Sequence, residues 1–183
     1  MRRVPLAAVL FVSIAASCGG DAGDPQVGAC EDYCALVQVH CTAALSQYPD
    51  QSTCMRTCEA MPLGDPAQPT GNTVACRTFQ AAAAELTGAT TCTAAGPGGG
   101  EQCGTQCESF CQLADEICTG DFQAFASTDE CLAACRTFPA DPPFDSGDVA
   151  GDSFECRLYH LTAAATDPAI HCAHIVSTSP VCF

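Results

Sequence analysis

Lysine and tryptophan are absent from this 183-residue sequence, and arginine supplies all six of its basic side chains. Against them stand 21 aspartates and glutamates, which give a formal net charge of −15 at pH 7. A nucleic-acid-binding protein needs a basic surface to displace counterions from phosphate, whereas this chain would repel phosphate. The charge balance therefore excludes nucleic acid as a partner.

Cysteine, in contrast, is abundant, with 17 residues in the chain. The cytosol keeps thiols reduced, so this much cysteine is typical of proteins exported to an oxidising compartment. Hydrophobic residues make up 48% of the sequence, which is too high a share for a disordered protein. We therefore expect a folded, exported and disulfide-rich protein.

Residues 1–17 have the pattern of a signal peptide. Two arginines follow Met1, and an apolar run of 13 residues extends from Val4 to Ala16. This run is too short to span a hydrocarbon core about 30 Å thick, but it has the length of the apolar region of a signal peptide. Residues 18–29 lack apolar periodicity, so they are predicted to form a flexible tether.

The segment Ala15-Ala16-Ser17-Cys18 places small residues before a cysteine. It resembles the lipobox of bacterial lipoproteins, which implies that Cys18 is acylated and anchors the protein to a membrane. By the same resemblance, Gly19 after the cysteine favours the outer membrane or cell surface of a Gram-negative bacterium. The alternative is cleavage after Ser17 without lipidation, which would give a secreted or periplasmic protein.

The other cysteines form two sets of eight with nearly the same spacing. The intervening residues number 3, 6, 12, 3, 17, 15 and 10 in the first set and 3, 6, 12, 3, 20, 15 and 9 in the second. This agreement indicates an internal repeat. The first set is Cys30, Cys34, Cys41, Cys54, Cys58, Cys76, Cys92 and Cys103, and the second is Cys107, Cys111, Cys118, Cys131, Cys135, Cys156, Cys172 and Cys182. An even number remains once Cys18 is set aside, so all of them can pair.

The repeats are predicted to occupy residues 30–103 and 104–183. Units this small bury little apolar surface, so four disulfides in each, contributing about 2–4 kcal/mol apiece, would replace part of the core. Each unit is expected to be all-α with about three short helices, the third beginning at Asn72 or Asp152. The pattern resembles uncharacterised cysteine-rich lipoproteins of Gram-negative bacteria and points to no named domain family.

Paired cysteines four residues apart allow a geometric prediction of disulfides. Cys30 and Cys34 lie about 6 Å apart along a first helix, as Cys54 and Cys58 do along a second. If these helices are antiparallel, each cysteine of one pair faces one of the other pair. The predicted rungs are Cys30–Cys58, Cys34–Cys54, Cys107–Cys135 and Cys111–Cys131. The other four cysteines of each repeat can pair in three ways, which the sequence leaves open.

Three of the four histidines lie in the second repeat, as Cys156-x3-His160 and His171-Cys172-x-His174. Imidazole suits Zn(II) and Cu(II), so His160, His171 and His174 are candidate ligands of a Cu or Zn ion. The corresponding residues of the first repeat are Gln80, Thr91 and Ala94. The shared scaffold therefore does not require the histidines. The alternative is that they are solvent-facing or capping side chains near a helix end.

Other chemistry has weaker support. The loop with Asp145, Asp148 and Asp152 does not have the spacing of an EF-hand and is expected to be solvated. The close cysteine pairs are C-x3-C rather than the C-x2-C of redox sites, and no G-x-S-x-G motif occurs. We therefore predict no enzyme but a lipid-anchored, disulfide-stapled surface module for interaction or structure, whose protein or ligand partner is unknown. Metal binding is the alternative function.

Overall fold

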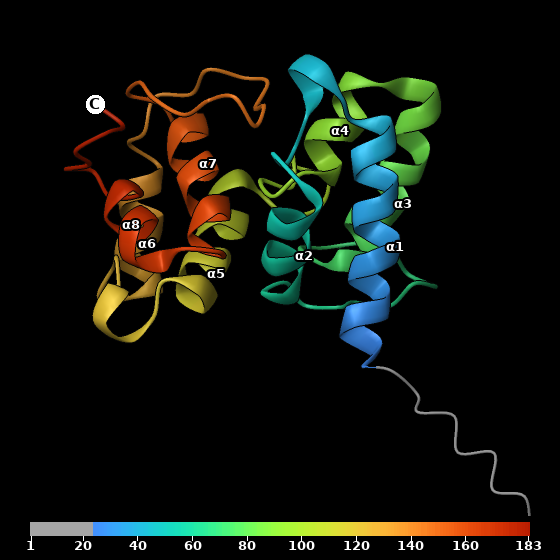
Figure 1. Ribbon diagram of the computed structural model, residues 1–183, viewed down its shortest axis with the longest axis horizontal. Coiled ribbons are helices and arrows are strands. Elements are labelled where there is room, and N and C mark those ends of the chain that lie inside the picture. Colours follow the sequence, from blue (N-terminus) through green and yellow to red (C-terminus); the bar gives the residue numbers. More distant parts are fainter. Residues whose placement is uncertain (1–23) are drawn as a thin grey trace, which may run out of the picture.

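The computed structural model describes residues 24–183, which fold into two helical bundles that lie side by side (Figure 1). Within this range the elements are α-helices and short 3-10 helices, without a strand. The all-α, disulfide-rich fold class predicted from the sequence is confirmed. None of the helices between residues 24 and 183 has the length and hydropathy of a membrane span. The predicted signal peptide and Cys18 lie outside the described residues.

Each repeat contributes four α-helices, one more than predicted. In repeat 1 these are α1 (Pro25–His40), α2 (Gln51–Glu59), α3 (Val74–Thr87) and α4 (Ala89–Ala95). In repeat 2 they are α5 (Gln106–Ile117), α6 (Thr128–Cys135), α7 (Phe154–Ala164) and α8 (Pro168–His171). Single 3-10 turns cover Ala43–Leu45, Gly120–Phe122 and Cys172–His174. The additional helices α4 and α8 are short and begin directly after Gly88 and Asp167.

Disulfides join the helices within each repeat. Cys30–Cys58 and Cys34–Cys54 link α1 to α2, and Cys107–Cys135 and Cys111–Cys131 link α5 to α6. These are the four pairs that the helix spacing predicts. The pairs left open by the sequence are Cys41–Cys92, Cys76–Cys103, Cys118–Cys172 and Cys156–Cys182. No disulfide among the described residues crosses from one repeat to the other.

The core of repeat 1 contains fewer large side chains than the core of repeat 2. In repeat 1, Tyr33 and Tyr48 are fully buried, and their hydroxyl oxygens lie 2.8 Å apart. In repeat 2, Phe110 packs edge-on against Phe125 and Phe138. So small an apolar interior leaves an important part of the stability to the disulfides, as in other small scaffolds.

Helix α1 begins earlier than predicted. The Asp24 side chain accepts a hydrogen bond from the Gln26 backbone N–H at 2.9 Å, and Pro25 occupies the first helical position. The Gln26 side chain donates to the carbonyls of Cys58 and Met61 at 3.1 and 3.0 Å. The predicted tether of residues 18–29 is therefore wrong at its end, because capping and these tertiary hydrogen bonds make residues 25–29 part of the bundle.

The third helix of each repeat begins later than predicted. Thr73 caps α3 and Ser153 caps α7, each through its hydroxyl. The predicted caps, Asn72 and Asp152, lie one residue earlier in the sequence. Their side chains instead accept hydrogen bonds from the arginine five residues along the chain. Because Thr73 and Ser153 have extended backbones, the side-chain oxygens of the residues before them point toward the arginine rather than toward the N–H groups at the start of the helix.

Arg77 holds the last segment of repeat 1, residues 96–103, which we call its tongue. The Arg77 side chain is fully buried. It donates to the carbonyls of Gly96 and Pro97 at 3.0 and 3.2 Å and to the Asn72 side-chain oxygen at 2.7 Å. Burial lowers the pKa of Arg77 because a charged group is costly away from water. The charge is stabilised by these neutral acceptors.

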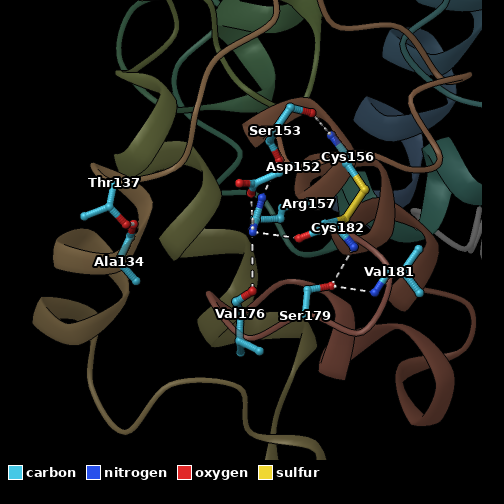
Figure 2. Close-up of polar contacts among 10 residues, drawn as sticks. All are labelled: Ala134, Thr137, Asp152, Ser153, Cys156, Arg157, Val176, Ser179, Val181 and Cys182. Atoms are coloured by element: carbon cyan, nitrogen blue, oxygen red, sulfur yellow. Dashed lines mark hydrogen bonds and ion pairs between the residues drawn. A yellow bond between two sulfur atoms is a disulfide. The ribbon is translucent and has the colours of Figure 1, made fainter.

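Arg157 has the same role in repeat 2, whose tongue is residues 176–183 (Figure 2). Arg157 donates to the carbonyls of Val176 and Cys182 at 3.4 and 2.8 Å. Its guanidinium also pairs with the Asp152 carboxylate at 3.0 Å. Each tongue therefore begins four residues after a disulfide-bonded cysteine, Cys92 or Cys172. In each, a buried arginine donates to the carbonyl of the first tongue residue.

The tongue of repeat 1 packs on repeat 2. We call the surface that receives it the seat: Gln106 and Ser109 of α5 with Phe154 and Leu158 of α7. A Cβ on Gly98 would lie 3.2 Å from Leu158 and 3.8 Å from Phe154, so the tongue backbone rests on these side chains. The Ser109 hydroxyl lies 3.3 Å from the Arg77 guanidinium. Hydrogen bonds from Gln112 to the Ala60 carbonyl and between Ser46 and Ser146 extend the interface.

Candidate metal centre

Three histidine side chains of repeat 2 converge where α7, α8 and the following 3-10 turn meet. His160 lies near the middle of α7, His171 ends α8, and His174 ends the 3-10 turn. Cys172 lies between His171 and His174 in the sequence, and its disulfide to Cys118 fixes this segment to the end of α5. The histidines predicted from the sequence as ligands are thus brought together from two segments.

The ring nitrogens have the spacing of metal ligands. The Nδ1 atom of His160 lies 2.9 Å from the Nδ1 of His171 and 3.3 Å from the Nδ1 of His174. Each of the three rings offers one nitrogen within 4.8 Å of the others. Nitrogens that each lie about 2.0–2.1 Å from one tetrahedral Zn²⁺ are about 3.3 Å apart. Little movement separates this arrangement from that of a bound ion.

The protonation state also suits a ligand. The His160 side chain is 6% exposed, and burial, assisted by the neighbouring His174 ring, lowers its pKa to about 4. Burial likewise lowers the pKa of His171. The His160 Nε2 lies 3.2 Å from the Val149 carbonyl oxygen, where only an N–H can donate. Its proton is therefore on Nε2, which leaves the Nδ1 lone pair directed at the other rings.

A second group of possible ligands shares His160. The sulfurs of Cys156 and Cys182 lie near this ring. They are joined to each other in a disulfide, so neither is a thiolate. The ligand set of the oxidised protein consists of imidazoles.

Repeat 1 uses the equivalent positions for ordinary packing. The Thr91 hydroxyl donates to the Gly88 carbonyl at 2.8 Å, and Ala94 is fully buried. Gln80, at the position of His160, is half-buried. The shared fold therefore does not account for the convergence of histidines in repeat 2.

The acidic loop of repeat 2 does not gather its carboxylates. Asp148 accepts a hydrogen bond from the Asp145 backbone N–H at 2.8 Å, and Asp145 caps the following turn through the Gly147 N–H. Asp152 is engaged with Arg157. The same loop supplies the Val149 carbonyl to His160, a backbone contribution for which the sequence carries no side-chain signal.

Fold and site together define a small, disulfide-stapled helical repeat protein with a histidine cluster in its second repeat. The chain matches the BfoA family C-terminal domain twice, over residues 25–106 and 104–179, and it belongs to this family. The two matched segments correspond to the two repeats, and the match supplies a family name that the cysteine pattern alone did not. Among the curated proteins and the solved structures, none matches the chain.

Proposed function

We propose that this protein is an exported, lipid-anchored and non-catalytic module that binds one Zn(II) or Cu(II) ion through His160, His171 and His174. The main support is the approach of three ring nitrogens to within ligand spacing, at 2.9 and 3.3 Å from the His160 Nδ1. The sequence alone favours a surface module for interaction or structure, with metal binding second. The convergence reverses this order, because solvent-facing or capping histidines have no reason to meet.

An ion would resolve a conflict within the cluster. With its proton on Nε2, His160 offers a single Nδ1 lone pair, which both His171 and His174 approach. One acceptor cannot fully satisfy two N–H donors in this partly buried place. A cation at the centre would accept a lone pair from each ring, and the Val149 carbonyl would orient His160 as an outer partner.

The proposed location follows from the cysteines. So many disulfides form and persist only in an oxidising compartment outside the cytosol. The sixteen described cysteines are all paired with one another, so none of them is available to bridge to Cys18. This supports lipidation of Cys18 and an outer-membrane or cell-surface address. A chain released after cleavage at Ser17 is the alternative.

The non-catalytic assignment rests on the contacts of the cluster. The described hydrogen bonds of the His160, His171 and His174 rings go to one another or to the Val149 carbonyl. None goes to a hydroxyl, which supports a role for these rings other than the activation of a serine or threonine nucleophile.

Metal titration of the oxidised protein tests the metal site. We expect one Zn(II) or Cu(II) per chain by calorimetry and native mass spectrometry, and a loss of affinity of at least about tenfold in His171→Ala. His40→Ala, which removes the histidine outside the cluster, should bind like the wild type. The metal assignment is wrong if the wild type shows no saturable binding, or if the variants lose affinity equally.

Lipidation is tested separately in a Gram-negative host. The mature wild-type chain should gain the mass of its acyl chains and partition into detergent, whereas Cys18→Ser should remain aqueous. A wild-type chain that begins at residue 18 without added mass would contradict the anchor and leave the metal result unaffected.

A further inference from the structure

An apolar groove of about 540 Å³ lies on repeat 1, beside the N-terminal half of α1. Its lining includes Ala29 of α1, Leu63 and two prolines of the loop after α2, and Phe79 of α3. Phe79 is 55% exposed, a high value for an aromatic side chain in a chain with few of them. Asp32 supplies the one charged side chain of the lining. A groove of this kind marks a binding surface.

The groove is the counterpart of the seat. The cysteine register aligns four residues of its lining with the four residues of the seat: Ala29 with Gln106, Asp32 with Ser109, Val74 with Phe154, and Thr78 with Leu158. On repeat 2, the tongue of repeat 1 covers this surface and leaves a cavity of only about 20 Å³. On repeat 1, no residue of the described chain covers it. As far as residues 24–183 are concerned, the groove is therefore a seat without an occupant.

We propose that the groove receives the tongue of repeat 2 from a second copy of this chain, in a head-to-tail contact that continues the contact between the two repeats. The tongue that would enter begins as the tongue of repeat 1 begins. Arg157 binds the Val176 carbonyl as Arg77 binds the Gly96 carbonyl at the equivalent position (Figure 2).

The side-chain sizes are complementary across this contact. Within the chain, Gly98 rests on the large Leu158. Between copies, the equivalent tongue residue is the larger Thr178, and the equivalent seat residue is the smaller Thr78. Volume added on the tongue is thus removed from the surface that receives it, as close packing requires.

The end of the second tongue offers an apolar anchor. Phe183 aligns with Gly104, which lies at the repeat interface; a Cβ there would be only 2.9 Å from Asn72 and Ser109, so a side chain at this position requires those two side chains to move. Phe183 is 81% exposed in the single chain. In the proposed contact its ring would be covered by the groove of the next copy.

One pair of charges weakens the contact. Ser109 meets Arg77 beside the neutral Asn72 within the chain. Between copies, Asp32 would replace the serine and Asp152 the asparagine, so two carboxylates would face one guanidinium. We therefore expect the contact between copies to be weaker than that between repeats, and Asp32→Ser to strengthen it.

Such a contact joins two different surfaces, so it does not close a dimer but leaves a groove at one end and a tongue at the other. Each added copy presents a further groove. The proposal predicts a series of species that grows with concentration.

Sedimentation velocity over a concentration series tests this on the oxidised chain from residue 18 with Cys18→Ser. Species larger than a dimer should appear at high concentration. Phe79→Asp in the groove and Phe183→Asp on the tongue should each weaken association about tenfold or more, since each buries a charge in place of an aromatic ring. Leu86→Asp is the matched control, because Leu86 is an exposed apolar residue of α3 outside the groove lining, and it should leave association unchanged.

A photoreactive benzoylphenylalanine at position 178 identifies the contact. It should crosslink to the peptide that contains Thr78 in another copy. A chain that stays monomeric at all concentrations would overturn the proposal. So would association that resists both Phe79→Asp and Phe183→Asp, or a crosslink that joins two tongues or two grooves. Retention of all disulfides and of helical circular dichroism shows that each variant is folded.

Discussion

The two repeats share one disulfide framework but differ in what surrounds it. In repeat 1 the buried arginine, Arg77, meets only neutral acceptors, whereas in repeat 2 Arg157 pairs with Asp152. Repeat 1 carries an open apolar groove, and repeat 2 carries the histidine cluster. The difference teaches that crosslinks which fix the backbone leave other positions able to change. One copy could then acquire a binding surface and the other a ligand set.

The largest difference in stability should come from the arginines. Arg77→Met should lower the free energy of unfolding by about 3–5 kcal/mol, because it strands buried carbonyls and the Asn72 oxygen without a donor. Arg157→Met should cost about 1–2 kcal/mol less, since the Asp152 side chain is 56% exposed and can regain water. Urea denaturation of both variants measures the two values. Equal losses would mean that the carboxylate makes no difference.

Equivalent disulfides should affect stability alike and metal binding differently. Replacing both cysteines of Cys118–Cys172 by serine should lower the free energy of unfolding by about 2–4 kcal/mol. Replacing those of Cys41–Cys92 should lower it by the same amount, because the two disulfides close loops of similar length, with sequence separations of 54 and 51. Only the first change frees the segment with His171 and His174, so it alone should weaken Zn(II) binding, by about tenfold or more. Calorimetry on both variants decides. Similar Zn(II) affinities would contradict the proposed assembly of the site.

Acid should destabilise repeat 2 through His160. The pKa of His160 is about 4 in the folded protein against 6.5 for an ordinary histidine. Between these values the unfolded chain binds a proton that the folded chain does not, so the stability contribution of the neutral ring is lost as the pH falls. His160→Gln, which inserts the residue of repeat 1, should remove this part of the pH dependence. The free energies of unfolding of the metal-free wild type and His160→Gln are measured from pH 7 to pH 4. The same change with pH in both proteins would contradict the prediction.

The smallest expected effect comes from exchanging the arginine partners. Asn72→Asp would give Arg77 a carboxylate and should add about 0.5–1 kcal/mol, while Asp152→Asn should remove a similar amount from repeat 2. The gain should shrink at high salt, because a partly exposed ion pair is screened. Urea denaturation at two salt concentrations measures whether Asn72→Asp raises and Asp152→Asn lowers the free energy of unfolding.

The helical periodicity, together with the assumption that the paired helices are antiparallel, was sufficient to place four disulfides, since cysteines four residues apart on such helices meet in one arrangement without sliding. The Cys41–Cys92 pair could not be derived in this way. Its geometry depends on α4, a helix of seven residues after Gly88 that has no separate signal in the sequence.

Comparing the repeats singled out His160, His171 and His174 as ligands of one ion, but not the geometry that brings them together. That depends on α8 folding back against α7 and on a backbone carbonyl, that of Val149, which any residue could supply. The groove was not anticipated either. The apolar pattern shows which side chains avoid water, but whether a surface is covered depends on where the tongue of the other repeat goes.

The order of pairing along each repeat has a consequence for how the disulfides form. Within repeat 1, the first cysteine, Cys30, bonds to the fifth, Cys58, and the second, Cys34, bonds to the fourth, Cys54. An oxidase that joins thiols as they appear would link Cys30 to Cys34 and trap the chain. Correct maturation therefore calls for a catalyst that reshuffles mispaired bonds, and a host without such an isomerase should yield scrambled material even where its export machinery is intact.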